Sequence, residues 1–200
     1  SFMAIAFLAP TFQNIGWLQD PTEALANPIH EAPGADYWFG TTRQGYDVFS
    51  RTLFGTQAAL KVVALATTMS LIIGVPLGLV SGYLGGKIDR VLIFFMDTIY
   101  TLPGLLLSVT LAFVVGQGVI NAAIALSIAY IPQYYRIVRN HTTSVKTELF
   151  IEAAQAMGAP TSRILTRYLF FNVIQSVPVL FTLNAADAIL ILGGLGFLGL

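Results

Sequence analysis

Three long segments of the chain, residues 62–86, 98–135 and 168–186, contain no Asp, Glu, Lys or Arg. Soluble domains are about 25% charged, whereas this chain of 200 residues is 10% charged and 56% hydrophobic. A helix needs about 20 apolar residues to cross the hydrocarbon core of a bilayer. We therefore predict an all-α, polytopic membrane protein.

The longest uncharged segment is too long for a single span. It divides at a polar turn, VGQGVIN, over residues 115–121. We expect four full spans, at residues 57–84, 91–115, 120–138 and 168–190. Residues 1–9 are expected to be the C-terminal end of an earlier transmembrane helix and residues 10–55 an extracytoplasmic loop, followed by a transmembrane domain over residues 56–200.

The basic residues are concentrated in two segments between the predicted spans. Residues 85–90 and 136–167 together hold seven of the ten Lys and Arg residues and three of the ten acidic residues. Because two spans separate these segments, both must lie on the same side of the membrane, and the positive-inside rule places that side in the cytoplasm. The segment 140–167 is therefore expected to be a cytoplasmic loop.

Glycines recur along the first full span. Gly74, Gly78 and Gly82 lie four residues apart, Gly85 follows, and Pro76 lies among them. Small residues at this spacing allow membrane helices to approach closely. We expect this helix to pack closely against another helix. The alternative is that it moves during gating.

Two acidic residues lie within or near the apolar spans. Asp97 is expected near the cytoplasmic boundary, paired with Arg90 or with a cation from a loop. Asp187, which has Asn184 nearby, lies deeper in the last span. An intramembrane acid is energetically costly and is a functional candidate by default. Two roles are open for Asp187: it lines a translocation path, or it forms a structural pair. Asn184 and Asp97 are further candidates for lining such a path.

The sequence contains no pattern typical of catalysis, nucleotide binding or metal coordination. The chain has no cysteine and no glycine-rich phosphate-binding loop, and both histidines lie in predicted loops. We expect no enzyme activity, no metal site and no cofactor on this chain, so that energy comes from a partner. The alternatives are a secondary transporter or channel working alone, which the scarcity of intramembrane ionisable groups argues against, and a scaffold without transport.

A short amphipathic helix is predicted between the last two full spans. Its Ala-rich sequence favours a helix, and Phe150, Ala154 and Met157 form a narrow apolar stripe at helical spacing. Gly158 suits the end of this helix, and the Pro that follows two residues later can open another. Such a helix either fits a groove on another protein or packs on its own bundle.

The same segment, EAAQAMGAPTSRILTRYLFFN, resembles the EAA loop of bacterial ABC importer permeases. Glu152, Ala153, Ala154 and Gly158 match that motif at its spacing, although the Pro that usually follows is absent. The stretches FGTTRQGYDVFSR, GVPLGLVSGYLGGKIDR, MDTIYTLPGLLL and GFLGL are similar to motifs of the dipeptide/oligopeptide permease family, specifically its second permease subunit. Departures from the family pattern occur at Thr42, Tyr46 and Leu192.

This resemblance implies a type I ABC importer permease fold in a bacterial cytoplasmic (inner) membrane. It also implies a permease subunit of an ATP-driven, binding-protein-dependent importer of peptides, with nickel-chelate or another small solute as the alternative cargo. The implied partners are a homologous permease subunit, two cytoplasmic ATP-binding subunits that would hold ATP and Mg²⁺, an extracytoplasmic solute-binding protein and membrane lipid, but not nucleic acid. Because the family has six spans, the sixth would be missing from this chain.

The resemblance also implies two groups of site residues. The group expected to couple the permease to the ATPase consists of Phe150, Glu152, Ala153, Ala154, Met157 and Gly158. The group expected to contact the solute-binding protein consists of Tyr37, Trp38, Arg43 and Asp47.

Overall fold

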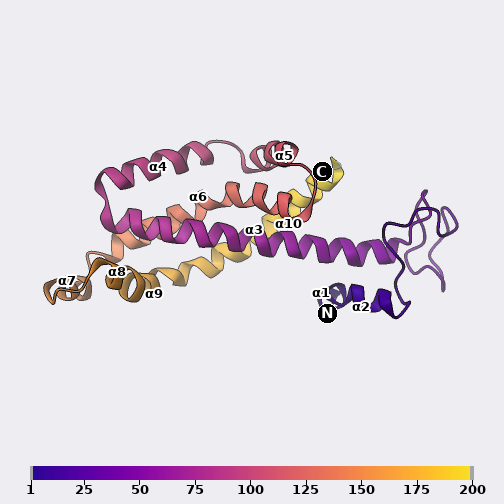
Figure 1. Ribbon diagram of the computed structural model, residues 1–200, viewed down its shortest axis with the longest axis horizontal. Helices are drawn as coiled ribbons and strands as arrows, with labels where there is room; N and C mark the ends of the chain where they lie inside the picture. Colours follow the sequence, from indigo (N-terminus) through magenta and orange to yellow (C-terminus); the bar gives the residue numbers. More distant parts are fainter. Residues whose placement is uncertain (1, 199–200) are drawn as a thin grey trace. The chain divides into compact units, whose positions relative to one another are not determined.

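The computed structural model describes residues 2–198 and shows a chain built of helices (Figure 1). The chain divides into two compact units, residues 1–61 and 62–200, and the boundary falls within the long helix α3 (Val48–Leu84). Among the described residues, the only β-type pairing is an isolated bridge between Thr41 and Asp47. The all-α fold class is therefore confirmed. Ser1, Gly199 and Leu200, and with them the end of the GFLGL motif, lie outside the described residues.

Unit 1 (residues 1–61) contains two short helices, α1 (Phe2–Phe7) and α2 (Ala9–Asn14), an irregular loop and the start of α3. The Gln57 side-chain amide donates to the Phe7 carbonyl (3.3 Å), and the Gln19 N–H donates to Ser50 Oγ (3.0 Å). These bonds attach the N-terminal helices and the loop to the first turns of α3. The small apolar core of the unit consists of Ala6, Ala9, Leu18 and Leu53.

The loop before α3 contains a tight turn. Residues of the FGTTRQGYDVFSR motif form hydrogen bonds to the backbone of this loop and of the first turn of α3. Thr41 is buried, and its hydroxyl accepts the Glu31 N–H (2.9 Å). Gly40 has φ +72°, and a Cβ at this position would lie 2.5 Å from the Glu31 carbonyl oxygen. Asp47 caps α3, because its carboxylate accepts the N–H (2.9 Å) and the hydroxyl (2.6 Å) of Ser50. The FGTTRQGYDVFSR motif therefore has a folding role in this loop.

Unit 2 (residues 62–200) is a helical bundle (Figure 1). After α3 come α4 (Gly86–Tyr100), α5 (Gly104–Val115), α6 (Val119–Val145) and α7 (Leu149–Ala156). A long helical segment over residues 161–197 follows, made of α8 (Thr161–Arg163), the π-helix η1 (Ile164–Leu169), α9 (Phe170–Val173), the 3-10 turn η2 (Ile174–Ser176) and α10 (Val177–Phe197). The main apolar core contains residues of α3, α5, α6, α7 and the segment 161–197.

The central helix of unit 2 is α6, which packs against α4, α5 and α10. Its buried residues include Tyr130, Tyr134 and Tyr135. Within the described residues, two helices are long and apolar enough to cross a membrane, Val48–Leu84 and Thr161–Phe197, and the pair α4 and α5 would make a third. The expected span at 120–138, which lies in α6, is not among them. Its polar and aromatic side chains lower its hydropathy, and they are tolerated because other helices surround it.

The segment expected as one span over residues 91–115 is two helices. α4 ends at Tyr100 and α5 begins at Gly104, and their axes differ by 86°. Pro103 has extended backbone angles (φ −54°, ψ 125°) at the break. A proline lacks the N–H that a continuing helix needs, and it disfavours helical angles at the residue before it. The break therefore follows from Pro103, which the hydropathy pattern did not take into account.

The glycines of α3 allow its backbone to contact α6 directly. A Cβ added at Gly74, Gly78 or Gly82 would lie 2.7 Å from an atom of α6: Tyr134 Cβ, the Tyr135 carbonyl oxygen and the Arg139 carbonyl oxygen, respectively. Close packing, rather than open space, therefore explains these three glycines. Gly85 is different, because it has φ +63° with open space around it and lies in the turn between α3 and α4.

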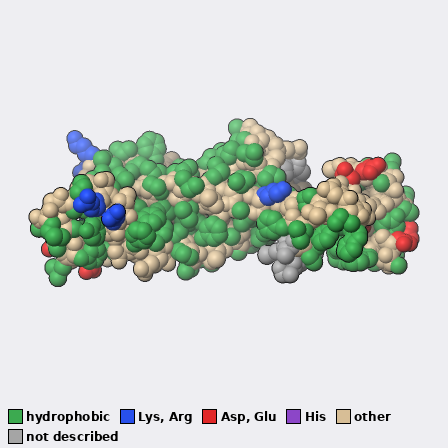
Figure 2. Space-filling model, turned by 60° about the horizontal axis from the view of Figure 1, so that its bottom comes forward, with side chains coloured by type: hydrophobic (Ala, Val, Ile, Leu, Met, Phe, Trp, Pro, Cys, Tyr) green, Lys and Arg blue, Asp and Glu red, His purple; other side chains and the backbone are tan. Residues whose placement is uncertain are grey.

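The junction of α3 with α4, the C-terminal end of α6 and helix α7 all lie at one end of unit 2 (Figure 1). Lys and Arg side chains gather at this end, on the left of Figure 2, and hydrophobic side chains cover much of the visible surface beside them. The Lys146 ammonium donates here to the Gly82 carbonyl (2.9 Å), in the last turn of α3. A cation at this place is favourable, because the C-terminal carbonyls of a helix carry partial negative charge.

Candidate functional site

Helix α7 ends in a Schellman motif at Gly158. The Gly158 N–H donates to the Gln155 carbonyl (2.9 Å), and the Ala159 N–H donates to the Ala154 carbonyl (3.0 Å). Gly158 has φ +78°, which is unfavourable for residues with a Cβ. A Cβ here would meet no atom within 4 Å. Glycine is therefore needed for the backbone conformation, and the surface beside it is open.

One face of α7 is buried, and the rest of the helix exposes apolar side chains. Ile151 and Ala154 are buried, whereas Leu149 and Met157 are 80% and 79% exposed and Phe150 is 41% exposed. The structure corrects the predicted stripe of Phe150, Ala154 and Met157, since only Ala154 faces the bundle. The reason is that Ile151, three residues before Ala154, lies on the same face of the helix and is buried with it. With this face toward the bundle, Phe150 and Met157 are directed outward.

Helix α7 contacts both of the long apolar helices. Ile151 belongs to the same core as Ile164 and Leu169 of η1. The Gln155 side-chain amide donates to the Tyr83 hydroxyl (3.1 Å), close to the end of α3. Helix α7 is therefore attached both to α3 and to the segment 161–197. Two further predicted coupling residues, Glu152 and Ala153, have exposed side chains on α7.

A polar cluster joins α3, α4 and α6 near α7. Arg139 Nε and Nη2 donate to the two carboxylate oxygens of Asp89, each at 2.6 Å. The Ser81 hydroxyl donates to the same carboxylate (2.5 Å) and lies 2.7 Å from the Tyr135 hydroxyl. The Asp89 and Arg139 side chains are only 16% and 25% exposed. This two-point pairing fixes both the distance and the orientation of α4 relative to α6.

Asp97 pairs with Arg136 of α6 rather than with Arg90, which lies on α4 itself. Arg136 Nη2 donates to Asp97 Oδ1 at 2.7 Å, and the Arg136 guanidinium lies 4.2 Å from the centre of the Tyr100 ring. Both side chains of the ion pair are about half exposed. The expected pairing of Asp97 is thus present with Arg136, the first basic residue of the 136–167 segment, because α6 runs beside α4 over this length.

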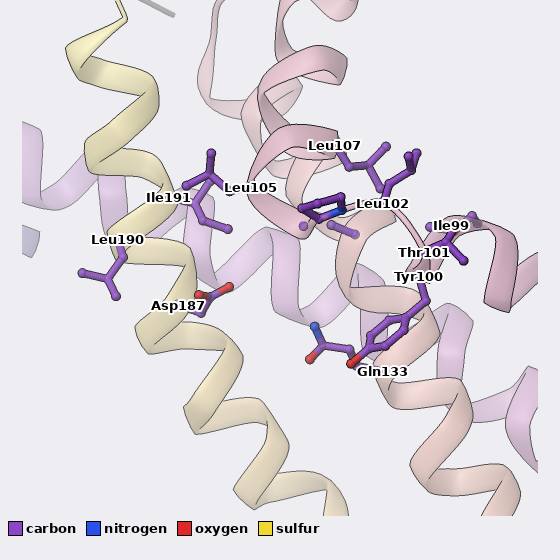
Figure 3. A pocket seen from close by; sticks show the side chains of 13 residues that line it. Ile99, Tyr100, Thr101, Leu102, Leu105, Leu107, Gln133, Asp187, Leu190 and Ile191 are labelled. Atoms are coloured by element: carbon purple, nitrogen blue, oxygen red, sulfur yellow. The ribbon is translucent and has the colours of Figure 1, made fainter.

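A cavity of about 590 Å³ lies where α4 breaks into α5, facing α6 and α10 (Figure 3). The apolar part of its wall includes Leu102, Leu105 and Ile191. Asp187 from α10 and Gln133 from α6 point into the space between their helices (Figure 3). Of the three polar residues suggested for a translocation path, Asp187 is the one that lines this cavity.

The polar groups next to the cavity link α6 to α10. The Tyr130 hydroxyl donates to Asp187 Oδ2 at 2.9 Å. One turn away, Asn184 and Tyr134 are both buried inside the bundle. Asn184 therefore lies inside the bundle, behind the cavity wall, whereas Asp187 reaches the opening.

The residues expected to contact a solute-binding protein lie in unit 1. Trp38 is exposed although its ring packs on Phe49 (5.0 Å between ring centres), so it has a packing role as well as an accessible surface. Tyr37 is half-buried and Arg43 is exposed. Asp47 caps α3, as described above, which gives this residue a structural reason to be present.

Tyr130, Gln133, Arg136 and Arg139 were not singled out from the sequence. They lie three residues apart on α6, a spacing that turns by about 60° per step, so the four side chains spread over about half of the helix surface. That polar pattern is the signal that could have identified them within an otherwise apolar segment. Across the described part of the chain, no three His, Asp or Glu side chains are grouped so that they could hold a metal ion.

Comparison with known families adds to this geometry. Residues 74–200 match the model of the binding-protein-dependent transport system inner membrane component family. The chain belongs to this family of ABC importer permeases. The matched range contains the glycine face of α3, the α4–α5 break, α7 and the cavity, so the structural features described for unit 2 are those of a family member.

Two named relatives of the permease extend the similarity beyond that range. The dipeptide transport system permease protein DppC of Alkalihalophilus pseudofirmus is 35% identical over 201 residues, which cover 100% of this chain and 64% of that protein. The glutathione transport system permease protein GsiD of Pectobacterium atrosepticum is 34% identical over 172 residues, which cover 86% of this chain and 57% of that protein. The chain thus spans about three fifths of the length of these relatives.

Proposed function

We propose that this chain is the membrane-spanning part of a permease subunit that imports short peptides in an ATP-driven, binding-protein-dependent system. The observation that carries the proposal is the family match over residues 74–200. The matched residues include the helices that line the cavity, and the exposed helix α7. The names of the two relatives, which refer to dipeptide and glutathione transport, support a short peptide as the cargo.

In this proposal the permease works with a homologous permease subunit, two cytoplasmic ATP-binding subunits and an extracytoplasmic solute-binding protein. ATP and Mg²⁺ bind to the partner subunits, and the chain itself catalyses no reaction. The end of unit 2 that carries α7 faces the cytoplasm of a bacterium, because the Lys and Arg residues gather there (Figure 2).

Helix α7 is proposed as the contact with an ATP-binding subunit. Leu149, Phe150 and Met157 expose apolar surface at the end of the bundle, and Glu152 adds an acceptor for a basic group. An amphipathic helix with exposed apolar anchors fits a groove on a partner. Because α7 contacts both α3 and η1, movement of the groove would reach both long helices of the permease.

The experiment compares Met157→Asp with Met157→Leu in the complete importer. Met157 is largely exposed, so neither substitution is expected to unfold the permease. We expect Met157→Asp to lower co-purification of the ATP-binding subunits and ATP-dependent uptake of a dipeptide at least tenfold, while Met157→Leu keeps both. Equal co-purification and uptake for the two variants would show that α7 does not dock in this way.

A further inference from the structure

Asp187 lies at the middle of an apolar helix. Ten residues of α10 precede it and ten follow it, so it is about 15 Å from either end. Its side chain is exposed at the surface of unit 2. A carboxylate in this position is disfavoured in lipid and is found where a water-filled cavity or a partner group can solvate it.

The cavity beside Asp187 provides such an environment. Its volume of about 590 Å³ falls in the range of small-molecule sites, roughly 300–1,000 Å³. Asp187 is the only Asp, Glu, Lys, Arg or His among the described residues that line it. Gln133, on the facing helix, adds a side-chain carbonyl acceptor, and most of the other residues that line the cavity are apolar. The cavity therefore combines one negative charge with a surface that is part polar and part apolar.

The two arginines of α6 form ion pairs with other carboxylates. In the described part of the chain, Arg139 pairs with Asp89 and Arg136 pairs with Asp97, and neither forms an ion pair with Asp187. One oxygen of Asp187 accepts the Tyr130 hydroxyl, which orients the carboxylate. A carboxylate can accept further hydrogen bonds, so Asp187 has both the charge and the capacity to bind a cationic ligand.

We propose that Asp187 and Gln133 bind the ammonium group at the amino terminus of a peptide as it passes through this cavity. The proposal rests on the proposed function and adds a chemical preference to it: the permease favours solutes with a free amino terminus over those in which it is blocked. Asp187 supplies the ion pair, and the side-chain carbonyl of Gln133 supplies a second acceptor. The apolar residues of the wall, among them Leu102, Leu105 and Ile191, contact the peptide side chains.

The test uses the complete importer in proteoliposomes with one dipeptide in two forms, with a free or an acetylated amino terminus. The solute-binding protein is saturated with each form, so that its own preference does not enter the comparison. For the unsubstituted importer we expect faster uptake of the free form. Asp187→Asn should lower uptake of the free form about tenfold and leave uptake of the acetylated form unchanged, whereas Asp187→Glu should retain the preference.

The results separate the two proposals. If the unsubstituted importer takes up neither form when ATP is supplied, the proposed function fails. If uptake proceeds and Asp187→Asn leaves the ratio of the two forms unchanged, the ammonium site is wrong while the proposed function stands.

A second measurement does not depend on transport. Because these 200 residues contain no cysteine, Leu190→Cys places one reactive thiol in the cavity wall, one turn from Asp187, once any cysteine elsewhere in the subunit has been replaced by serine. We expect a cationic thiol reagent to react faster than an anionic one, and Asp187→Asn to remove that difference. The free dipeptide, but not its acetylated form, should slow the labelling. Two results would overturn the assignment. One is a ratio of the two labelling rates that Asp187→Asn leaves unchanged. The other is slower labelling in NaCl without dipeptide, compared at the same ionic strength.

Discussion

Arg139 binds both carboxylate oxygens of Asp89 at 2.6 Å and thereby clamps α6 to the first turn of α4. The same carboxylate accepts the Ser81 hydroxyl of α3, so three helices meet at one anion. The clamp lies at the end of unit 2 that carries α7 (Figure 1). This junction ties α3, α4 and α6 together at that end of unit 2.

Removing one partner of this clamp should destabilise the permease. We expect Arg139→Gln to lower the free energy of unfolding by about 1–3 kcal/mol, between the values typical of exposed and of buried ion pairs. Thermal unfolding of the purified complex measures the loss. In Asp89→Asn/Arg139→Gln the loss should be smaller than the sum of the two single losses, and strictly additive losses would contradict a direct pairing.

The second ion pair between the same helices should contribute less. Arg136 and Asp97 are about half exposed, and exposed pairs contribute about 0–1 kcal/mol. We expect Arg136→Gln to lower the free energy of unfolding by less than about 1 kcal/mol in the same thermal assay. A loss as large as that of Arg139→Gln would show that the contact of Arg136 with the Tyr100 ring matters more than its exposure suggests.

A methyl group on the glycine face of α3 should separate α3 from α6. In Gly78→Ala the new Cβ would lie 2.7 Å from the Tyr135 carbonyl oxygen, and overpacking of this kind costs about 1–3 kcal/mol. The matched control is Gly194→Ala in α10, where a Cβ meets no atom within 4 Å. We expect a lower unfolding temperature for Gly78→Ala and an equal or higher one for the control. The same shift for both variants would rule out the close contact.

Substitutions at Gly158 should distinguish two roles of this residue: its backbone conformation with positive φ, and the open surface beside it. Gly158→Asn keeps a residue that tolerates positive φ, so the fold should be retained with a small loss of stability, at most about 1 kcal/mol. Gly158→Trp or Gly158→Asp adds bulk or charge to the proposed docking surface. We expect these two variants to remain in the membrane and to lose ATP-coupled uptake.

The measurement for Gly158 is uptake into membrane vesicles, with the amount of permease in the membrane determined in parallel. The Asn variant serves as the control for backbone strain. Normal uptake by the Trp variant would exclude a tight contact at this position.

Local features of this chain could be predicted well from the sequence. The end of α7 depends on Gly158 and the backbone bonds of its neighbours, which are determined within a few residues. The helical fold class follows from uncharged segments long enough for a membrane. Pro103, by contrast, was visible in the sequence, and its effect on the 91–115 segment was missed because hydropathy averages over a helix and does not register a single missing N–H.

The sequence by itself determined that the chain is an all-α membrane protein with a short amphipathic helix ended by a glycine, because hydropathy and backbone conformation act over neighbouring residues. Only the tertiary structure decided which side chains meet: Arg136 rather than Arg90 at Asp97, Tyr130 at Asp187, and Ile151 with Ala154 on the buried face of α7. These contacts depend on the rotation and the offset of helices that are far apart in the chain, and no local pattern specifies either quantity.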